Sequence, residues 1–186
     1  MKLVILPLTP DLWPAFEDLF GKNGACGGCW CMYWRLGSGY RKRPGEQNRA
    51  DFERIVDRGP PPGLLALHEG IAVGWCQLTA RAALPHLDRA RMTKRVDELP
   101  VWCISCFYVR KGYRRQGITS GLIAAALQTA KRAQAPALEA YPIDTAVKRS
   151  SADVYTGAVS AFMRAGFRIV ARPAPHRAVM RHDLRR

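Results

Sequence analysis

Apolar residues recur along the chain at two spacings, one typical of helices and one typical of strands. After Gly117, apolar residues three and four positions apart share one helical face, which predicts a helix packed on a sheet: Ile118, Leu122, Ile123, Ala126 and Ala130. Start and stop signals predict three more helices, over residues 11–20, 44–58 and 151–165. The last of these ends at Gly166, a usual position for a left-handed cap.

Short apolar runs predict strands between these helices. The stretch LLALHEGIAVGWCQL holds two apolar runs around Glu69-Gly70 and predicts a hairpin over 64–78. Further strands are predicted over 2–6, 101–109, 137–143, 167–171 and 178–184. Strands that alternate with helices indicate an α/β (α+β) fold, a sheet with helices on its faces.

Strict alternation along the strand 101–109 predicts which of its side chains share a face. One face would carry Cys103, Ser105, Phe107 and Val109, and the other Trp102, Ile104, Cys106 and Tyr108. No acidic side chain lies on this strand.

Two segments interrupt the regular pattern. Residues 21–40, GKNGACGGCWCMYWRLGSGY, combine glycines with cysteines and aromatic residues, which indicates a loop that lines a pocket; alternatively, its aromatic residues only cap the core. Residues 81–100 carry several arginines between two prolines and predict a charged excursion on the surface. A length of 186 residues predicts one domain over 1–186.

The charge balance adds a preference for anionic partners. Lys and Arg number 29 against 15 Asp and Glu, a formal net charge of +14, which attracts polyanions without specifying which. The N-terminal apolar run is too short for a signal peptide, and no stretch is long enough to cross a bilayer. We therefore expect a cytoplasmic protein with no membrane partner, whose six cysteines are thiols.

A short cationic turn precedes the helix at 118. It holds Arg110, Lys111, Arg114 and Arg115 between glycines, and the first amides of the helix lack an intrahelical partner. These features predict an anion cradle. Ile118 stands where a nucleotide-hydrolase phosphate loop needs lysine, so ATP or GTP turnover is not expected, and the glycine spacing does not fit a dinucleotide fingerprint.

The stretch Arg114-Arg115-Gln116-Gly117-Ile118-Thr119 resembles the [Q/R]-x-x-G-x-[G/A] signature of the GNAT superfamily of acyl-CoA-dependent N-acyltransferases. Thr119 stands at the last position of the signature, where the family has Gly or Ala. The order of elements is also similar, from the strand before the turn to a closing helix AFMRAGF that ends at Gly166-Phe167. The resemblance covers residues 64–184 and leaves 21–63 as a variable region on the acceptor side.

The resemblance implies a GNAT-like mixed, splayed sheet of about six to seven strands, flanked by about four helices. Coenzyme A would lie between the strands 101–109 and 137–143, with its pyrophosphate on backbone N–H groups of Arg115 to Thr119. Main-chain groups of Phe107 and Val109 would pair with the pantetheine amides. The implied cofactor-binding residues are Phe107, Tyr108, Val109, Arg114, Arg115, Gln116, Gly117, Ile118 and Thr119.

Direct transfer of an acetyl group to an amine needs an acceptor for the proton of the amine and a donor to the leaving thiolate. Glu139, and Asp97-Glu98 upstream, are the acids best placed to accept a proton, although each is an ordinary carboxylate on a plainer interpretation. Phe162 occupies the slot of the tyrosine that serves the family as thiolate donor. Tyr155, seven residues earlier and on the same helical face, is the candidate replacement, through its hydroxyl or by packing on pantetheine.

Two features bear on the acceptor side. The connection between Tyr141 and Tyr155 is longer than the usual two to six residues, which indicates a rebuilt acceptor pocket. Trp30, Tyr33 and Trp34 are candidates to line it.

The cysteines invite a zinc interpretation, from Cys26, Cys29 and Cys31 with a distant fourth ligand. Cys103 and Cys106 would lie on opposite faces of their strand and cannot share one metal without a bulge. We therefore expect no metal.

The sequence thus predicts a transferase that moves an acetyl group from acetyl-CoA to a primary amine of a small molecule or protein. The alternative is a basic nucleic-acid-binding protein that uses the basic runs 89–95 and 41–43, or an acetyltransferase whose amine is borne on RNA. Whether the chain forms a homodimer stays open.

Overall fold

The computed structural model describes residues 1–145 and 151–185, and the side chains of all of these except 151–153. Its strands are β1 (Val4–Pro7), β2 (Gly63–His68), β3 (Ile71–Ala80), β4 (Trp102–Val109), β5 (Ala137–Ala140), β6 (Arg168–Ala174) and β7 (Arg177–Asp183). Its α-helices are α1 (Trp13–Phe20), α2 (Tyr33–Leu36), α3 (Gly45–Arg58), α4 (His86–Arg89), α5 (Ile118–Arg132) and α6 (Val159–Arg164). Five 3₁₀ helices complete the elements of the described residues: Pro10–Leu12, Gly37–Lys42, Arg81–Ala83, Arg91–Thr93 and Ser151–Thr156.

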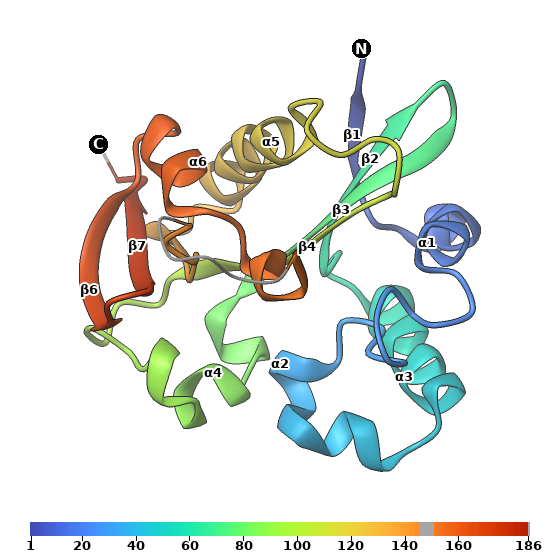
Figure 1. Ribbon diagram of the computed structural model, residues 1–186, viewed down its shortest axis with the longest axis horizontal. Helices are drawn as coiled ribbons and strands as arrows, with labels where there is room; N and C mark the ends of the chain where they lie inside the picture. Colours follow the sequence, from blue (N-terminus) through green and yellow to red (C-terminus); the bar gives the residue numbers. More distant parts are fainter. Residues whose placement is uncertain (146–150, 186) are drawn as a thin grey trace.

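These strands form one sheet in the order β1-β2-β3-β4-β5-β7-β6. Every neighbouring pair is antiparallel except β4 and β5, which are parallel. In Figure 1, α5 and α6 lie on one side of the sheet, and α1 to α4 lie below and to its right. The mixed sheet with helices on its faces confirms the predicted fold class. No helix among the described residues is both long and apolar enough to span a membrane.

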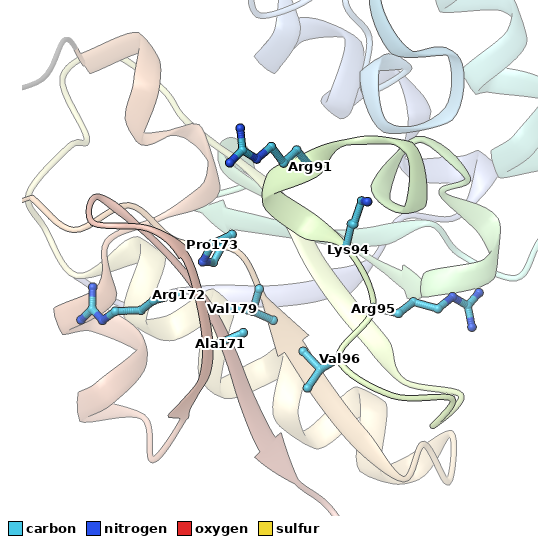
Figure 2. A pocket seen from close by; sticks show the side chains of 8 residues that line it. All are labelled: Arg91, Lys94, Arg95, Val96, Ala171, Arg172, Pro173 and Val179. Carbon is cyan, nitrogen blue, oxygen red and sulfur yellow. The ribbon is translucent and has the colours of Figure 1, made fainter.

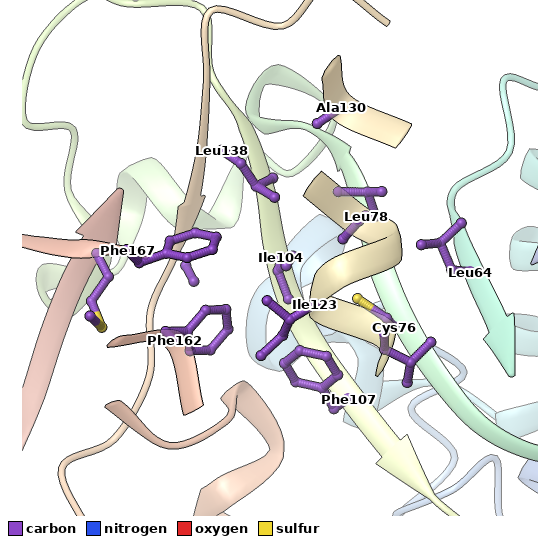
Figure 3. Packing of buried hydrophobic residues seen from close by; sticks show 14 of the residues in the cluster. Leu64, Cys76, Leu78, Ile104, Phe107, Ile123, Ala130, Leu138, Phe162 and Phe167 are labelled. Carbon is purple, nitrogen blue, oxygen red and sulfur yellow. The ribbon is translucent and has the colours of Figure 1, made fainter. Parts of the chain in front are cut away.

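The first layer of the core lies between the sheet and α5 and α6; we call it the α5–α6 cluster. The buried face of α5 consists of the predicted residues Ile118, Leu122, Ile123, Ala126 and Ala130. Figure 3 shows Ile123 and Phe162 packed over Ile104 and Phe107 of β4. A Cβ at Gly74 of β3 would lie 2.5 Å from Ile118, so glycine there lets the start of α5 approach the sheet closely.

Two clusters cover the opposite face. The α1–α3 cluster packs aromatic side chains of the N-terminal segment on Trp75 of β3, among them Trp13, Phe16, Phe20, Trp30 and Phe52. The α2–α4 cluster consists of Trp34, Leu84, Leu87, Cys103, Tyr141 and Val179, with Tyr155 partly buried against it. These two clusters fix the segments 21–42 and 81–100 beneath β4.

A β-bulge in β4 overturns the strict alternation predicted for 101–109. The register with β3 shifts between Gln77 and Leu78, and Ser105 is the extra residue of β4. As a result, Trp102, Ile104, Phe107 and Val109 all pack toward α5 and α6. Cys103, Cys106 and Tyr108 face the other side, in the α2–α4 and α1–α3 clusters. Cys103 and Cys106 therefore lie on the same face, contrary to the prediction.

The predicted single helix over 151–165 is also wrong. The chain forms the 3₁₀ helix Ser151–Thr156, breaks at Gly157, where φ is +86°, and then forms α6. Tyr155 precedes the break and Phe162 follows it, so the two residues do not share a helical face. Tyr155 contacts the α2–α4 cluster, and Phe162 is fully buried in the α5–α6 cluster.

Candidate active site

The parallel strands β4 and β5 pair over only three residues each. Trp102 to Ile104 pair with Leu138 to Ala140, and beyond Ile104 and Ala140 the two strands no longer pair. Chain segments from both sides border the opening that follows. Ile143, beyond β5, pairs with Ala158 and Arg177, and the 3₁₀ helix Ser151–Thr156 contacts β4. We call this region the β4–β5 opening.

The main-chain groups of β4 that face the opening follow from the ladder with β3. The Arg110 N–H donates to the Val73 carbonyl at 3.0 Å. Bonded and non-bonded pairs alternate along an antiparallel ladder, so Tyr108 bonds to β3 as well. The N–H and C=O groups of Phe107 and Val109 therefore point away from β3, toward the opening. Tyr108 contributes its ring elsewhere, 5.5 Å from Phe20 in the α1–α3 cluster.

The turn between β4 and α5 presents free amides at the edge of this opening. Arg115 and Gly117 have positive φ angles of 63° and 81°, which turn the backbone into the helix start. In the described part of the chain, no main-chain hydrogen bond outside the helices and strands uses an N–H of residues 114–117. The first amides of α5, including that of Thr119, add to these donors. A Cβ at Gly117 would meet none of the described protein atoms within 4 Å, so the cradle is open.

Three of the four cations of this turn have no ion-pair partner among the described residues. Arg110 is held by the Ala72 carbonyl at 2.9 Å and by Asp18 at 2.5 Å. Lys111, Arg114 and Arg115 are exposed and form no ion pair within the described residues. Side chains also brace the turn from within: the Arg114 Nε donates to the Val109 carbonyl at 3.3 Å, and the Gln116 amide donates to the Gly112 carbonyl at 2.9 Å. Ile118 is buried beneath.

Glu139 lies on β5 before the opening, inside a buried ion-pair network. Its Oε1 accepts hydrogen bonds from the Arg181 Nε at 3.1 Å and Nη2 at 2.6 Å. Its Oε2 accepts from the Tyr141 hydroxyl at 3.1 Å and lies 3.5 Å from Arg81. The carboxylate is 2% exposed. Both oxygens are occupied, so this geometry favours a structural role over the predicted catalytic one.

Asp97 and Glu98, the other predicted acids, do not offer a free base at the opening either. Asp97 forms a two-pronged ion pair with Arg181, at 2.6 and 3.0 Å. Hydrogen bonding from Arg181 lowers the pKa of Asp97. The Glu98 side chain is 94% exposed and lies 3.8 Å from Arg95.

Tyr155 borders the opening from the side of the α2–α4 cluster. Burial raises the pKa of its hydroxyl, and the neighbouring Cys106 and Tyr33 act in the same direction. The hydroxyl is therefore protonated at neutral pH and available as a donor. The interval from 146 to 150, within the long connection predicted to rebuild the acceptor pocket, lies outside the described residues.

The aromatic residues predicted to line the acceptor side separate into different roles. Trp30 is 4% exposed and stacks between Phe20 and Trp13, so it belongs to the core. Trp34 is also buried, and its Nε1 donates to the Ser105 carbonyl at 2.9 Å. Tyr33 is partly exposed beside Trp34 and remains the candidate to line the pocket.

A polar network that the sequence interpretation missed fixes the β4 bulge. The Ser105 hydroxyl donates to the Gln77 Oε1 at 2.8 Å, and the Gln77 Nε2 donates to the Cys31 carbonyl at 3.1 Å. With the Trp34 bond, this network ties the loop 21–40 to the strand that carries Phe107. The sequence did contain a signal for this network, because Ser105 and Gln77 are polar residues within strands that are otherwise mostly apolar.

Five of the six cysteines are buried or partly buried, and Cys26 is exposed. Burial raises the pKa of Cys31 well above its usual range, and the Trp75 Nε1 donates to its sulfur at 3.0 Å. Burial raises the pKa of Cys29 to about 11. The six cysteines form no disulfide, and within residues 1–145 and 151–185 no cluster of three or more His, Cys, Asp or Glu could hold a metal.

The mixed sheet with helices on its faces has the fold of solved acetyltransferase structures. A sequence profile of the acetyltransferase (GNAT) family matches residues 29–155. The chain belongs to this family, and it is an acetyltransferase. No curated protein matches the sequence.

Solved structures share the fold at low sequence identity. One described as an acetyltransferase is 16% identical, with a TM-score of 0.61, and the match covers 98% of this chain and 100% of that one. YncA of Salmonella typhimurium, with its cofactor acetyl-CoA, is 12% identical, with a TM-score of 0.58 and 100% and 96% covered. A chain of the NatC complex bound to Gag peptide and CoA is 12% identical, with a TM-score of 0.57 and both chains covered fully.

Proposed function

We propose that this protein transfers the acetyl group of acetyl-CoA directly to a primary amine of a small molecule or a protein. The observation that carries the proposal is the β4–β5 opening, into which the main-chain groups of Phe107 and Val109 point. These two residues present main-chain N–H donors and C=O acceptors, which suit the two amides of the pantetheine arm. The acetyl-CoA and CoA complexes of proteins with this fold support coenzyme A as the ligand.

The turn before α5 suits the pyrophosphate of coenzyme A. The amides of residues 115–119 and the helix start favour an anion, since they are donors at the positive end of the helix dipole. Lys111, Arg114 and Arg115 add positive charge around them. Arg114 would release its contact with the Val109 carbonyl, leaving that oxygen to pantetheine.

The reaction requires a neutral amine and a proton for the leaving sulfur. The amine nitrogen attacks the thioester carbonyl, a C–N bond forms, and the C–S bond breaks. In our proposal Tyr155 donates its hydroxyl proton to the departing thiolate, and the proton released by the amine leaves through water. Glu139 is not assigned to this second transfer because Arg181 and Tyr141 occupy its oxygens.

Thermal unfolding with three ligands in parallel tests the cofactor. A ligand that binds only the folded state at 100 times its Kd stabilises that state by about 2.7 kcal/mol. We expect acetyl-CoA and CoA to raise the Tm and ATP to leave it unchanged. The double variant R114Q/R115Q should lose most of this rise, while a matched double variant K131Q/R132Q, at the far end of α5, should keep it.

The alternative function, nucleic-acid binding, predicts a different pattern. An oligoribonucleotide would raise the Tm, its effect would fall steeply with added salt, and acetyl-CoA would have none. A rise in Tm with acetyl-CoA, together with acetylation of an amine in a turnover assay, supports the acetyltransferase. No rise with acetyl-CoA or CoA would refute our proposal for the opening.

A further inference from the structure

A groove outside the β4–β5 opening carries a strong positive charge. It has a volume of about 230 Å³ and lies between the segment that follows α4 and the outer strands β6 and β7. Its cationic lining residues are Arg91, Lys94, Arg95 and Arg172. Figure 2 shows these four side chains spread around a centre formed by Val96 and Val179.

The cations of the groove differ in how far acids neutralise them. Arg95 bonds to Asp88 at 3.2 Å and lies 3.8 Å from Glu98, and Arg172 lies 3.4 Å from Asp144. Arg91 and Lys94 are exposed and have no ion-pair partner within the described residues. These two cations are therefore the ones available to an anionic ligand.

The floor of the groove is apolar. Val96, Ala171, Pro173 and Val179 form it, and Val96 is 41% exposed although it is a large apolar residue. Among the residues that the structure describes, no aromatic side chain lines the groove, so these residues offer no surface on which a nucleobase could stack. An aliphatic side chain flanked by carboxylates matches the floor and the rim together, and a phosphodiester backbone matches only the rim.

The groove shares the α2–α4 cluster with Tyr155, which borders the opening. Val179 and Ala171 belong to the α2–α4 cluster, which also contains Tyr141 and Tyr155. The 3₁₀ helix Arg91–Thr93 contacts α4 and β6, which both contribute residues to this cluster. Residues that line the groove and Tyr155 therefore pack against one cluster.

We propose that this groove binds an acidic segment with aliphatic residues, belonging to a polypeptide acceptor whose amine reaches the β4–β5 opening. The proposal rests on the acetyl transfer to an amine proposed above. It narrows the acceptor to a peptide or protein with carboxylates near the acetylated amine.

Fluorescence anisotropy tests the groove directly. The probes are a dye-labelled peptide of alternating glutamate and valine, its counterpart with lysine for glutamate, and a labelled single-stranded oligoribonucleotide. The proteins are the wild type, R91Q/K94Q in the groove, and K131Q/R132Q, which removes the same charge from α5 on the other face of the sheet. All are measured with saturating acetyl-CoA, and their Tm values show that each is folded.

We expect the wild type to bind the acidic peptide and not the basic one. R91Q/K94Q should weaken this binding about fivefold, since two partly exposed ion pairs are lost, while K131Q/R132Q should change it less than about twofold. V96S should also weaken it, because the floor loses its apolar contact. In turnover, R91Q/K94Q should raise the KM for the acidic peptide with kcat unchanged.

Three results would overturn the proposal. The first is an equal loss of acidic-peptide binding in the two double variants, and the second is no binding of the acidic peptide to the wild type. The third is tighter binding of the oligoribonucleotide through Arg91 and Lys94, which would make the groove a nucleic-acid surface. The Tm rise with acetyl-CoA separates this test from the proposed function. If acetyl-CoA raises the Tm and the acidic peptide does not bind, only the groove assignment fails; if acetyl-CoA has no effect, the acetyl transfer fails.

Discussion

Glu139 provides the sharpest test of how the site is built, because a catalytic base and a structural ion pair respond differently to the same change. The substitution E139Q removes the charge and keeps the shape. Arg181 would retain Asp97, at 2.6 Å, and Arg81 would retain Asp88, also at 2.6 Å. The positive charges of Arg181 and Arg81 therefore stay partly balanced by these two aspartates.

The structure sets the size of the expected loss. Breaking one side of a buried ion pair costs about 3–5 kcal/mol of unfolding free energy. The amide introduced by E139Q keeps one acceptor oxygen for Arg181, so we expect a loss at or just below the lower end of this range, about 2–3 kcal/mol. For a chain of this length, that corresponds to a decrease in Tm of about 5–10 °C.

Urea unfolding and steady-state turnover, both at a temperature where wild type and variant are folded, provide the assay. We expect the free energy of unfolding to fall and kcat per folded molecule to stay within about threefold of the wild type. D97N is the matched control, since the Asp97 side chain is 46% exposed and its loss should cost at most about 1 kcal/mol. A kcat reduced by more than about a hundredfold with unchanged unfolding would make Glu139 the base and refute our reasoning.

Three further predictions follow from residues of the opening and of the ion-pair network. Y155F should lower kcat at least about tenfold and leave the Tm rise with acetyl-CoA intact, because only the proton donor is lost; an unchanged kcat would assign Tyr155 to packing. G117A should lower the free energy of unfolding by about 1 kcal/mol and weaken the Tm rise with acetyl-CoA, since φ is +81° at Gly117; an unchanged urea midpoint would contradict this. The pKa of Asp97 is lower in the folded state than in the unfolded chain, so its pairing with Arg181 stabilises the fold above the ordinary aspartate pKa and is lost as the pH falls through the folded value. D97N should therefore make unfolding between about pH 4 and pH 2 less steep, as followed by circular dichroism, and identical acid-unfolding curves would count against it.

Local patterns were enough to predict most of the fold. The buried face of α5 and the hairpin of β2 and β3 follow from spacing within one element, and both are present as predicted. The family resemblance predicted that the strands 101–109 and 137–143 separate around coenzyme A. The pairing of β4 with β5, which ends at Ile104 and Ala140, agrees with this prediction. Gly166 has the positive φ expected of a cap, +83°.

Features that depend on pairing between distant segments could not be predicted in the same way. The bulge at Ser105 inserts one residue without changing the composition of β4, so alternation failed there. Sequence alone showed no partner for Glu139, because Arg181 is placed beside it only by the register of β5 with β7. The break before α6 did have a local signal, Gly157, which the helical spacing of Tyr155 and Phe162 obscured.

The hydrogen bonds around Ser105 have a consequence for protein engineering. By its position in the sequence, the loop 21–40 is an obvious segment to exchange in order to change the acceptor, but Trp34 and Cys31 of this loop hold the bulged strand through Ser105 and Gln77. A transplanted loop without these two contacts would leave buried polar groups unmatched, at Gln77 of β3 and at Ser105 of β4, two residues before Phe107. Redesign of acceptor choice in this enzyme therefore has to carry the Trp34 indole and the Cys31 carbonyl along as fixed anchor points, and to vary only the exposed positions between and beyond them.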